Sequence, residues 1–579
     1  MPVVLGLLLL PVAVVIVRLI GRDHPAMNGD DALIELRTRD VFTRNTPLLG
    51  SYQRYGWNQA GPLYFYLLAI PYRLFGQSFT TIQISVVVMN CAAAIATILI
   101  MRRLHGDAAA AVAAALIAVA FHALSMRTLT DPWEPSISVM LLVMLAVVAY
   151  EASTGNVRSW FATVLVASLL AQAYASVTTI AIALAVIGIA IGIVRLRRTE
   201  VAQSIAKPVL ALVALAILLW SPSIIEQLSN SPGNVRAALS YFGENRETLG
   251  GRDALGALRI ESGLHAPWIT NSVPKETFSP FVDVGAGPVL PIAFILFAVA
   301  GVVAWRRREW LALQLVTLVA AFGIVGLLSL RTLTRPFFVW ILMPYRAFGL
   351  LLWLASFVVL FATVPRARNL GCAVAIAVLV GVGALSTADA ARAHLGADSG
   401  PAAFDAAAAR VSAELRALDA PILVRSEVGG QLLTPSGYAR DETAVALLLN
   451  GVAVVVDVDS RNRFGPQRAH PELAQYELRL MNHKDPMPKG FRELTVVDPL
   501  GSTRGDREGL AQSVTRRCVL ANGTQPPPSE DASASLRWLE NCSQRDGEAK
   551  RQIGVLLDDF EDLPRISFRL GAIAATGGL

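Results

Sequence analysis

Charged residues are scarce in this chain of 579 residues. Asp, Glu, Lys and Arg together make up 16% of it, whereas hydrophobic residues make up 54%, and the mean hydropathy is +0.51. A soluble domain ordinarily carries about 25% charged residues. The deficit excludes an ordinary soluble protein and predicts a polytopic membrane protein.

The motifs of several enzyme classes are missing as well. The sequence has no G-x-x-x-x-G-K-[ST] loop, which cradles nucleotide phosphates, and no G-x-S-x-G turn, which presents a nucleophilic serine. His24, His122 and His265 lack the paired spacing of zinc ligands. ATP-driven, serine-hydrolase and zinc-dependent functions therefore have no support.

Cysteine is rare, with four residues in the whole chain. Cys91 and Cys372 lie in apolar runs and are expected to be inert packing residues. Cys518 and Cys542 lie in the polar C-terminal part, where they are able to form a disulfide if that part is extracytoplasmic.

The net positive charge of the chain does not indicate binding to nucleic acid. The net charge is +6 and the pI is 9.2, but the basic residues cluster in short loops between apolar runs. Such clusters orient a membrane protein in its bilayer. We therefore expect no nucleic-acid partner.

The apolar runs predict about eleven membrane spans, since a span needs about 20 largely apolar residues. The first run has no small-residue cleavage site before Arg22, so we expect a retained span. Residues 61–76 are rich in aromatics and predict an interfacial helix. The predicted spans are 3–17, 82–101, 108–123, 136–150, 160–173, 177–194, 209–220, 288–305, 311–330, 337–364 and 372–385.

The basic loops set the orientation. With a cytoplasmic N-terminus, the strongly basic short loops all fall on the cytoplasmic side, as the positive-inside rule requires. We therefore expect a multi-pass protein of the cytoplasmic membrane, with outer loops 21–80 and 221–287 and an extracytoplasmic C-terminus. The basic residues of the inner loops are Arg102, Arg103, Arg158, Arg195, Arg197, Arg198, Arg306, Arg307, Arg308, Arg366 and Arg368.

The composition divides the chain into a membrane module, 1–388, and a soluble extracytoplasmic domain, 389–579. Residues 402–418 and 443–449 have helical patterns, and 421–425 and 452–458 are β-branched runs typical of buried strands. Strands alternating with helices predict an α/β domain. Residues 523–535, rich in Pro and Ser, predict a loop.

Two acidic sites fall on the outer face. Asp30 and Asp31 follow the first span, where they cap a helix, supply a general base that deprotonates a hydroxyl, or coordinate a metal. Asp131 and Glu134 flank Pro132 after the third span. A plain Asp-Pro turn is one interpretation, and a carboxylate pointing into a cavity shared with Asp30 is the other.

Three arginines are predicted to lie away from the cytoplasmic side, where the positive-inside rule would not place them. Arg331, Arg335 and Arg346 lie at the outer face or at membrane depth. They either anchor lipid headgroups or clamp a phosphate by bidentate hydrogen bonds. Pro344 would open the helix beside Arg346, which makes Arg346 the best phosphate candidate.

Residues 1–390 resemble the GT-C superfamily of polytopic glycosyltransferases that use polyprenyl-phosphate sugars. The resemblance rests on a short first span, the acidic pair in 29–32 (GDDA), the stretch 57–66 (WNQAGPLYFY) and the Arg-Arg after the second span. The superfamily includes protein mannosyltransferases, aminoarabinose transferases and actinobacterial cell-wall arabinosyl- and mannosyltransferases. Residues 132–135, 221–228 (SPSIIEQL) and 232–234 look most like the actinobacterial branch.

The resemblance implies inverting transfer of a sugar from a polyprenyl-phosphate donor to a cell-envelope glycan or glycolipid. By position it assigns the catalytic carboxylate to Asp30, with Asp31 standing where many members have Glu, and the second acidic residue to Asp131. Many relatives have His-Pro where this chain has Gln59 and Ala60.

From this we expect one outward cavity at the membrane surface. Asp30 would take the acceptor proton, Arg346 with Arg331 would hold the donor phosphate, and a cleft would bind the acceptor. A divalent metal (Mg²⁺, Mn²⁺ or Ca²⁺) stays open as a cofactor. The alternatives are a lipid-linked sugar flippase, which would carry charges at the bilayer midplane, and a non-catalytic scaffold of cell-wall assembly. The expected cleft residues are Trp57, Asn58, Tyr64 and Tyr66.

Overall fold

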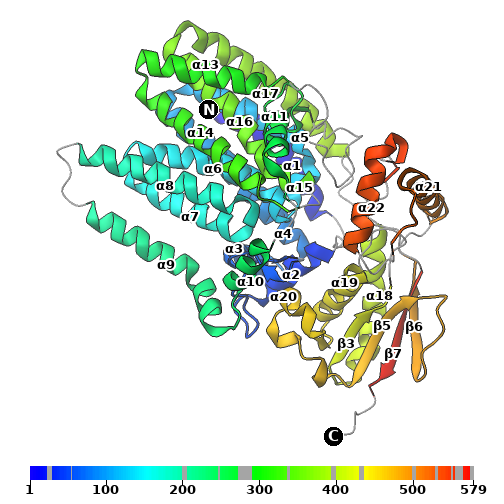
Figure 1. Cartoon of the computed structure of the whole chain (residues 1–579). Coiled ribbons are helices and arrows are strands. Elements are labelled where there is room, and N and C mark those ends of the chain that lie inside the picture. The colour runs from blue at the N-terminus through cyan, green and yellow to red at the C-terminus, as the bar shows by residue number, and fades with distance from the viewer. Residues whose placement is uncertain are drawn as a thin grey trace.

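A bundle of long helices forms most of the molecule, with a sheet and a helical hairpin on one side of it (Figure 1). The structure is a computed structural model. It describes residues 1–21, 29–53, 55–198, 205–244, 248–270, 290–334, 339–392, 399–428, 436–498, 504–527, 532–549, 552–553 and 565–573.

Nine helical segments of this described part are long and apolar enough to cross a membrane. Two further apolar helices are shorter, α7 (Val157–Ala173) with 17 residues and α13 (Ile292–Arg307) with 16. Each predicted span falls on one of these eleven segments, which confirms the polytopic helical fold class. The nine are α1 (Pro2–Ile20), α4 (Phe79–His105), α5 (Asp107–Thr130), α6 (Glu134–Ser153), α8 (Ala175–Arg197), α9 (Ala206–Ser229), α14 (Trp310–Leu330), α17 (Arg366–Arg392) and the segment Trp340–Thr363 with α16 (Arg346–Thr363).

Helix α6 lies at the centre of the bundle. It packs against α4, α7, α8 and α14, and nearly all of its residues are buried. A Cβ on Gly188 or Gly192 of α8 would come within 2.5 or 2.3 Å of α6 carbonyl oxygens. Glycine at these positions therefore lets the two helices approach closely, as small residues do in membrane bundles.

The two ends of α6 differ in charge. At its C-terminal end, Nε2 of His105 on α4 lies 2.6 Å from the hydroxyl of Tyr150, and Arg103 pairs with Glu151. At its N-terminal end, α6 begins at Glu134, three residues after Asp131. The C-terminal end of α6 therefore carries an ion pair and a histidine contact, and its N-terminal end adjoins the acidic turn.

The segment predicted as a polar loop from residue 221 contains several helices. Helix α9 continues to Ser229, because Ile224, Ile225 and Leu228 extend its helical pattern of apolar residues. It is followed by α10 (Asn234–Gly243), α11 (Gly250–Glu261) and α12 (Pro267–Thr270). Residues 271–289 lie outside the described residues.

The C-terminal part contains a five-stranded sheet in the order β4-β3-β5-β7-β6. The predicted pattern holds for α18 (Ser399–Arg416), β3 (Ile422–Ser426), α19 (Ser436–Leu449) and β4 (Val454–Val455), with β3 parallel to β4 and to β5. Short turns, η3 (Val458–Ser460), α20 (Arg461–Phe464), η4 (Pro466–Arg468) and η5 (Pro471–Leu473), lead to β5 (Tyr476–Asn482). Strands β5, β6 (Phe491–Val497) and β7 (Ile566–Ala572) were not predicted from the sequence; β7 pairs antiparallel with both β5 and β6.

Alternate residues of the sheet face α18 and α19. Ile422, Val424, Leu478, Leu480 and Phe568 are fully buried in one apolar cluster with residues of these helices. The period of two along each strand fixes the register, because a slip of one residue would turn these side chains to the other face.

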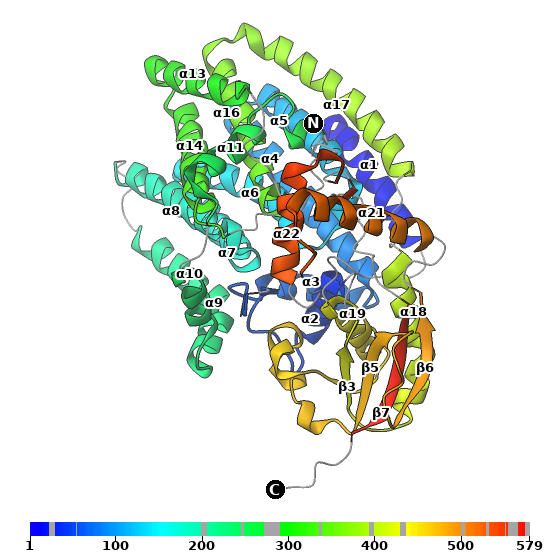
Figure 2. The same ribbon diagram turned by 45° about the vertical axis from the view of Figure 1, so that its right-hand side comes forward.

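Two helices near the C-terminus form a disulfide-linked hairpin. Helix α21 (Arg504–Asn522) packs against α22 (Ala532–Arg545), and Cys518 is bonded to Cys542, the pairing expected for an extracytoplasmic part. Residues 532–535, predicted as loop, belong to α22, because Leu536, Leu539 and Cys542 recur at helical spacing. Figure 2 shows the hairpin over one end of the bundle.

Helix α2 (Gly29–Asp40) joins the membrane bundle to the C-terminal part. It packs against α3 (Leu63–Leu74), the predicted interfacial helix, and against α19. Both carboxylate oxygens of Asp40 accept hydrogen bonds from Arg468, at 2.6 and 2.7 Å. Arg37 donates to Asp40 at 3.0 Å and to the carbonyl of Phe464 at 3.3 Å.

Replacing Asp40 by asparagine is expected to destabilise this junction by about 3–5 kcal/mol, because two buried guanidinium groups would lose their shared carboxylate. Hydrogen exchange of α2 and α20, together with thermal unfolding, would measure the loss. The control is Glu414→Gln, which breaks an exposed pair with Arg492 and should cost less than about 1 kcal/mol. Equal effects of the two variants would contradict the expectation.

Candidate active site

The acidic pair begins helix α2. Asp30 and Asp31 lie in its first turn and are partly exposed. Carboxylates at this position interact favourably with the positive end of the helix dipole. Asn28 lies outside the described residues.

The second acidic site is the turn between α5 and α6. The carboxylate of Asp131 accepts hydrogen bonds from the backbone N–H of Trp133 at 3.0 Å and from the hydroxyl of Ser136 at 2.6 Å. These two bonds hold the start of α6 in the way that an N-terminal cap does. Asp131 therefore has the turn role that its sequence context predicted.

Tyr64 of α3 interacts with residues of both acidic sites. Its hydroxyl donates to the carbonyl of Pro132 at 2.7 Å. Burial raises the pKa of Tyr64 well above its usual range, and the charges of Glu134, Asp131 and Asp31 raise it further. These carboxylates, from two elements far apart in the sequence, thus all influence one phenol electrostatically.

Glu134 is the most enclosed member of this carboxylate group, with 5% of its surface exposed. Ser51 donates a hydrogen bond to its carboxylate, and Asp30 lies within electrostatic range of it. The sequence analysis noted Glu134 for its place beside Asp131 but did not include it among the site residues. Its spacing of three residues from Asp131 was the available signal.

The residues expected to line an acceptor cleft are engaged in packing. Asn58 is buried, donates its side-chain amide to the carbonyls of Gly50 and Asn462, and exchanges two hydrogen bonds with Asn234. Trp57, on β2 (Trp57–Asn58) beside β1 (Tyr52–Gln53), packs against Tyr241 and Phe242. The hydroxyl of Tyr66 donates to the carbonyl of Pro47 at 2.8 Å.

Arg346 is the first residue of α16 and follows a 3₁₀ turn, η2 (Met343–Tyr345), that contains Pro344. It is 8% exposed, and within the described part of the chain no carboxylate lies within salt-bridge distance of it. Turn η2 packs against α6, the helix that begins at Glu134. Arg346 therefore stands at the same central helix as the carboxylate group.

Glu261, the last residue of α11, is a second buried ionisable group near Arg346. Burial raises the pKa of Glu261 to about 8, and the charge of Arg346 opposes this shift. Its Oε2 atom is buried and accepts no hydrogen bond from the described residues. Nothing in the sequence distinguished Glu261 from the other polar residues of the segment predicted as a loop.

The other two arginines differ from Arg346. Arg331 ends α14 and is exposed; its backbone carbonyl accepts from Gly250 at 3.4 Å. Arg335 and His24 lie outside the described residues. Within the described ranges no group of three His, Cys, Asp or Glu side chains is arranged to hold a metal, so we assign no metal ligands.

The stability of α2 is expected to depend on pH through Glu35. This residue is 3% exposed and accepts a hydrogen bond from Tyr72 at 2.8 Å, yet burial raises its pKa from 4.5 to about 7. Between these two values the unfolded carboxyl ionises while the folded one keeps its proton. The free energy of unfolding should therefore fall as pH rises through this window, by up to roughly 3 kcal/mol in total.

Unfolding of the detergent-solubilised protein from pH 4.5 to 8 would measure this slope. Glu35→Gln should flatten it, because the amide keeps an acceptor for Tyr72 and does not titrate. Glu414→Gln, at an exposed site, should leave it unchanged. An identical slope in Glu35→Gln would show that other groups carry the pH dependence.

Comparison with solved structures finds several that are similar to this chain. The chain is similar to ArnT from Cupriavidus metallidurans bound to undecaprenyl phosphate, with 12% identity and a TM-score of 0.48 over 82% of this chain and 92% of that chain. It is also similar to the Archaeoglobus fulgidus oligosaccharyltransferase in complex with Zn and sulfate, with 11% identity and a TM-score of 0.42 over 82% and 68%.

A third similar structure is the oligosaccharyltransferase AglB from Archaeoglobus fulgidus in complex with an inhibitory peptide and a dolichol-phosphate, with 10% identity and a TM-score of 0.44 over 99% and 88%. Neither a protein-family profile nor a curated protein sequence matches the chain. The likeness concerns the fold, and the chemistry is argued from this chain's own residues.

Proposed function

We propose that this protein is a membrane glycosyltransferase that moves a sugar from a polyprenyl-phosphate donor to a cell-envelope glycan or glycolipid. The observation that carries the proposal is that Tyr64 of α3 donates to Pro132, between Asp131 and Glu134, and also feels the charge of Asp31, next to a helix that also packs on the turn before Arg346. A base and a phosphate clamp are the two groups that such a transfer requires.

Asp30 is the proposed general base. Asp131 is committed to two hydrogen bonds at the start of α6, and Glu134 is enclosed. Asp30 is partly exposed in the first turn of α2, where an acceptor hydroxyl can reach it.

The reaction is a single displacement that inverts the anomeric carbon. The acceptor oxygen attacks this carbon as Asp30 takes the hydroxyl proton, and the bond to the donor phosphate breaks. Arg346, with Arg331 and Arg335 as further candidates, stabilises the charge that develops on the departing phosphate. A buried guanidinium is suited to this role because it stays charged and binds two oxygens at once.

We place the reaction at the outer face of the cytoplasmic membrane. The basic loops would then face the cytoplasm, and the acidic turns and the C-terminal part would lie outside. The disulfide between Cys518 and Cys542 supports this orientation, because disulfides persist in oxidising compartments. Membrane lipids would surround the spans and supply the lipid-linked donor.

The test is a transfer assay with purified protein in nanodiscs. A radiolabelled polyprenyl-phosphate sugar and a cell-envelope glycan should yield labelled glycan of inverted anomeric configuration. A flippase would instead move the intact donor across the bilayer of a proteoliposome without forming product. Absence of both activities with a panel of sugar donors would favour a scaffold.

A further inference from the structure

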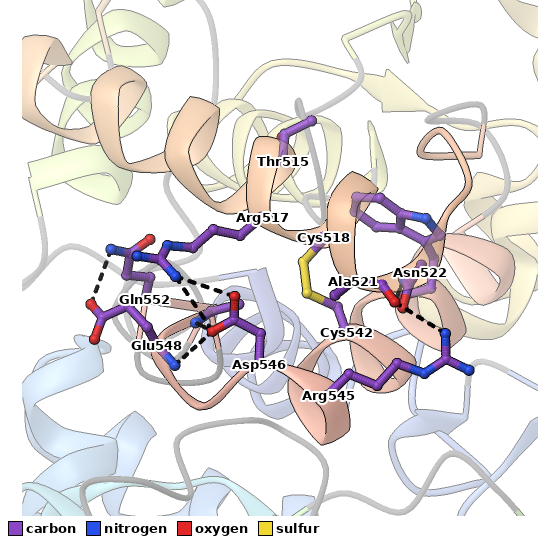
Figure 3. Close-up of a disulfide and its surroundings, with 12 residues drawn as sticks. Thr515, Arg517, Cys518, Ala521, Asn522, Cys542, Arg545, Asp546, Glu548 and Gln552 are labelled. Atoms are coloured by element: carbon purple, nitrogen blue, oxygen red, sulfur yellow. Dashed lines mark hydrogen bonds and ion pairs between the residues drawn. A yellow bond between two sulfur atoms is a disulfide. The ribbon is translucent and has the colours of Figure 1, made fainter.

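The hairpin of α21 and α22 holds a cleft of about 730 Å³ that the proposed reaction does not use. Its lining includes Arg516, Arg517 and Leu520 from α21, and Arg545 and Asp546 from the end of α22. The volume is within the range of small-molecule sites. Figure 3 shows Arg517 and Arg545 on opposite sides of the disulfide that ties the two helices together.

The cleft carries an excess of positive charge. Arg517 pairs with Asp546 at 3.2 Å, and Asp546 also accepts from the backbone N–H groups of Glu548 and Ala549. Arg545 donates to the carbonyl of Ala521 at 3.2 Å. Among the described residues no carboxylate lies within salt-bridge distance of Arg516 or Arg545, so the lining holds three guanidinium groups and one carboxylate.

The hairpin is docked beside the acidic turn of the candidate site. Trp340 and Ile341 at the start of the α16 segment pack against its apolar core. The rings of Trp340 and Trp133 lie 5.6 Å apart, and Trp133 donates its N–H to Asp131. Trp340 therefore links the hairpin that carries the cleft to the turn that carries Asp131.

We propose that this arginine cleft binds the acidic groups of an anionic glycan and so holds a carboxylate- or phosphodiester-bearing acceptor beside the active site. The proposal deepens the proposed function and rests on it, because a bound glycan is an acceptor only if the protein transfers a sugar to it. Arginine suits such groups because its fork matches two oxygens. A glycan is favoured over a lipid headgroup because the lining residues all come from 513–547, well past the last candidate membrane span of the described residues, which ends at Arg392.

Direct binding would test the cleft independently of turnover. The full-length protein in phosphatidylcholine nanodiscs is titrated with fluorescein-labelled hexagalacturonate, which has one carboxylate per sugar, and with labelled maltohexaose, which is neutral. We expect binding of the acidic probe that weakens as salt is raised. We expect no binding of the neutral probe.

The variant Arg516→Gln/Arg545→Gln should weaken binding of the acidic probe by about tenfold or more. The matched control, Arg410→Gln/Arg492→Gln, removes two exposed arginines of α18 and β6 and should change affinity by less than about twofold. Equal affinities of the two double variants would overturn the proposal, as would equally tight binding of maltohexaose. The thermal unfolding of each variant would show that the fold is kept.

Two further measurements separate the alternatives. If phosphatidylglycerol nanodiscs displace the acidic probe, the cleft binds lipid headgroups and the glycan assignment fails. Asp30→Asn should bind the probe as the wild type does. A protein that binds the probe but transfers no sugar would refute the proposed function and leave the anion cleft standing.

Discussion

Replacing Asp30 by asparagine is expected to reduce turnover by about 10²–10⁴-fold, the range over which a general base contributes. The amide keeps the size of the side chain but cannot take the acceptor proton. Donor affinity should stay nearly unchanged, because the proposed role of Asp30 is toward the acceptor. Transfer of labelled sugar under saturating donor and acceptor would measure the effect.

The control must remove the same helix-dipole contribution without touching the chemistry. Asp107→Asn does so, since Asp107 also lies in the first turn of a helix, α5, but at the basic end of the bundle. Each variant should lose about 0.3–1 kcal/mol of stability at most. Turnover in Asp30→Asn comparable to that of Asp107→Asn would refute Asp30 as the base, and Asp131 would be the next candidate to replace.

The membrane part of the fold was predictable because each span is encoded locally. A run of apolar residues long enough to cross a bilayer has few alternatives to a helix, since its backbone groups must be paired within the segment. The turn at Asp131 was predictable for a similar reason, because the residue before a proline is biased away from helix.

What the sequence did not reveal depends on contacts between distant segments. Arg468 and Asp40 are 428 residues apart, and no local pattern marks either as a partner. Strand β7 inserts between β5 and β6 from the far end of the chain. The burial of Glu261 likewise arises only when α11 packs against α14 and α16.

The second large effect on turnover is expected from replacing Arg346. Arg346→Gln should lower turnover by about 10²–10³-fold, the loss seen when one donor to a developing negative charge is removed. Arg346→Lys should fall between this variant and the wild type, because it keeps the charge but not the two-pronged geometry. Single-turnover rates with saturating donor would measure the chemical step.

A structural role for Arg346 would produce the same loss by a different route, since its removal leaves Glu261 buried without an opposing charge. The variant Arg346→Gln/Glu261→Gln separates the two. If the loss comes from an unopposed Glu261, replacing this buried ionisable group as well should restore thermal stability. Turnover should remain low, because the phosphate clamp is still absent. Recovery of turnover together with stability would show that Arg346 acts by holding the fold rather than by binding the departing phosphate.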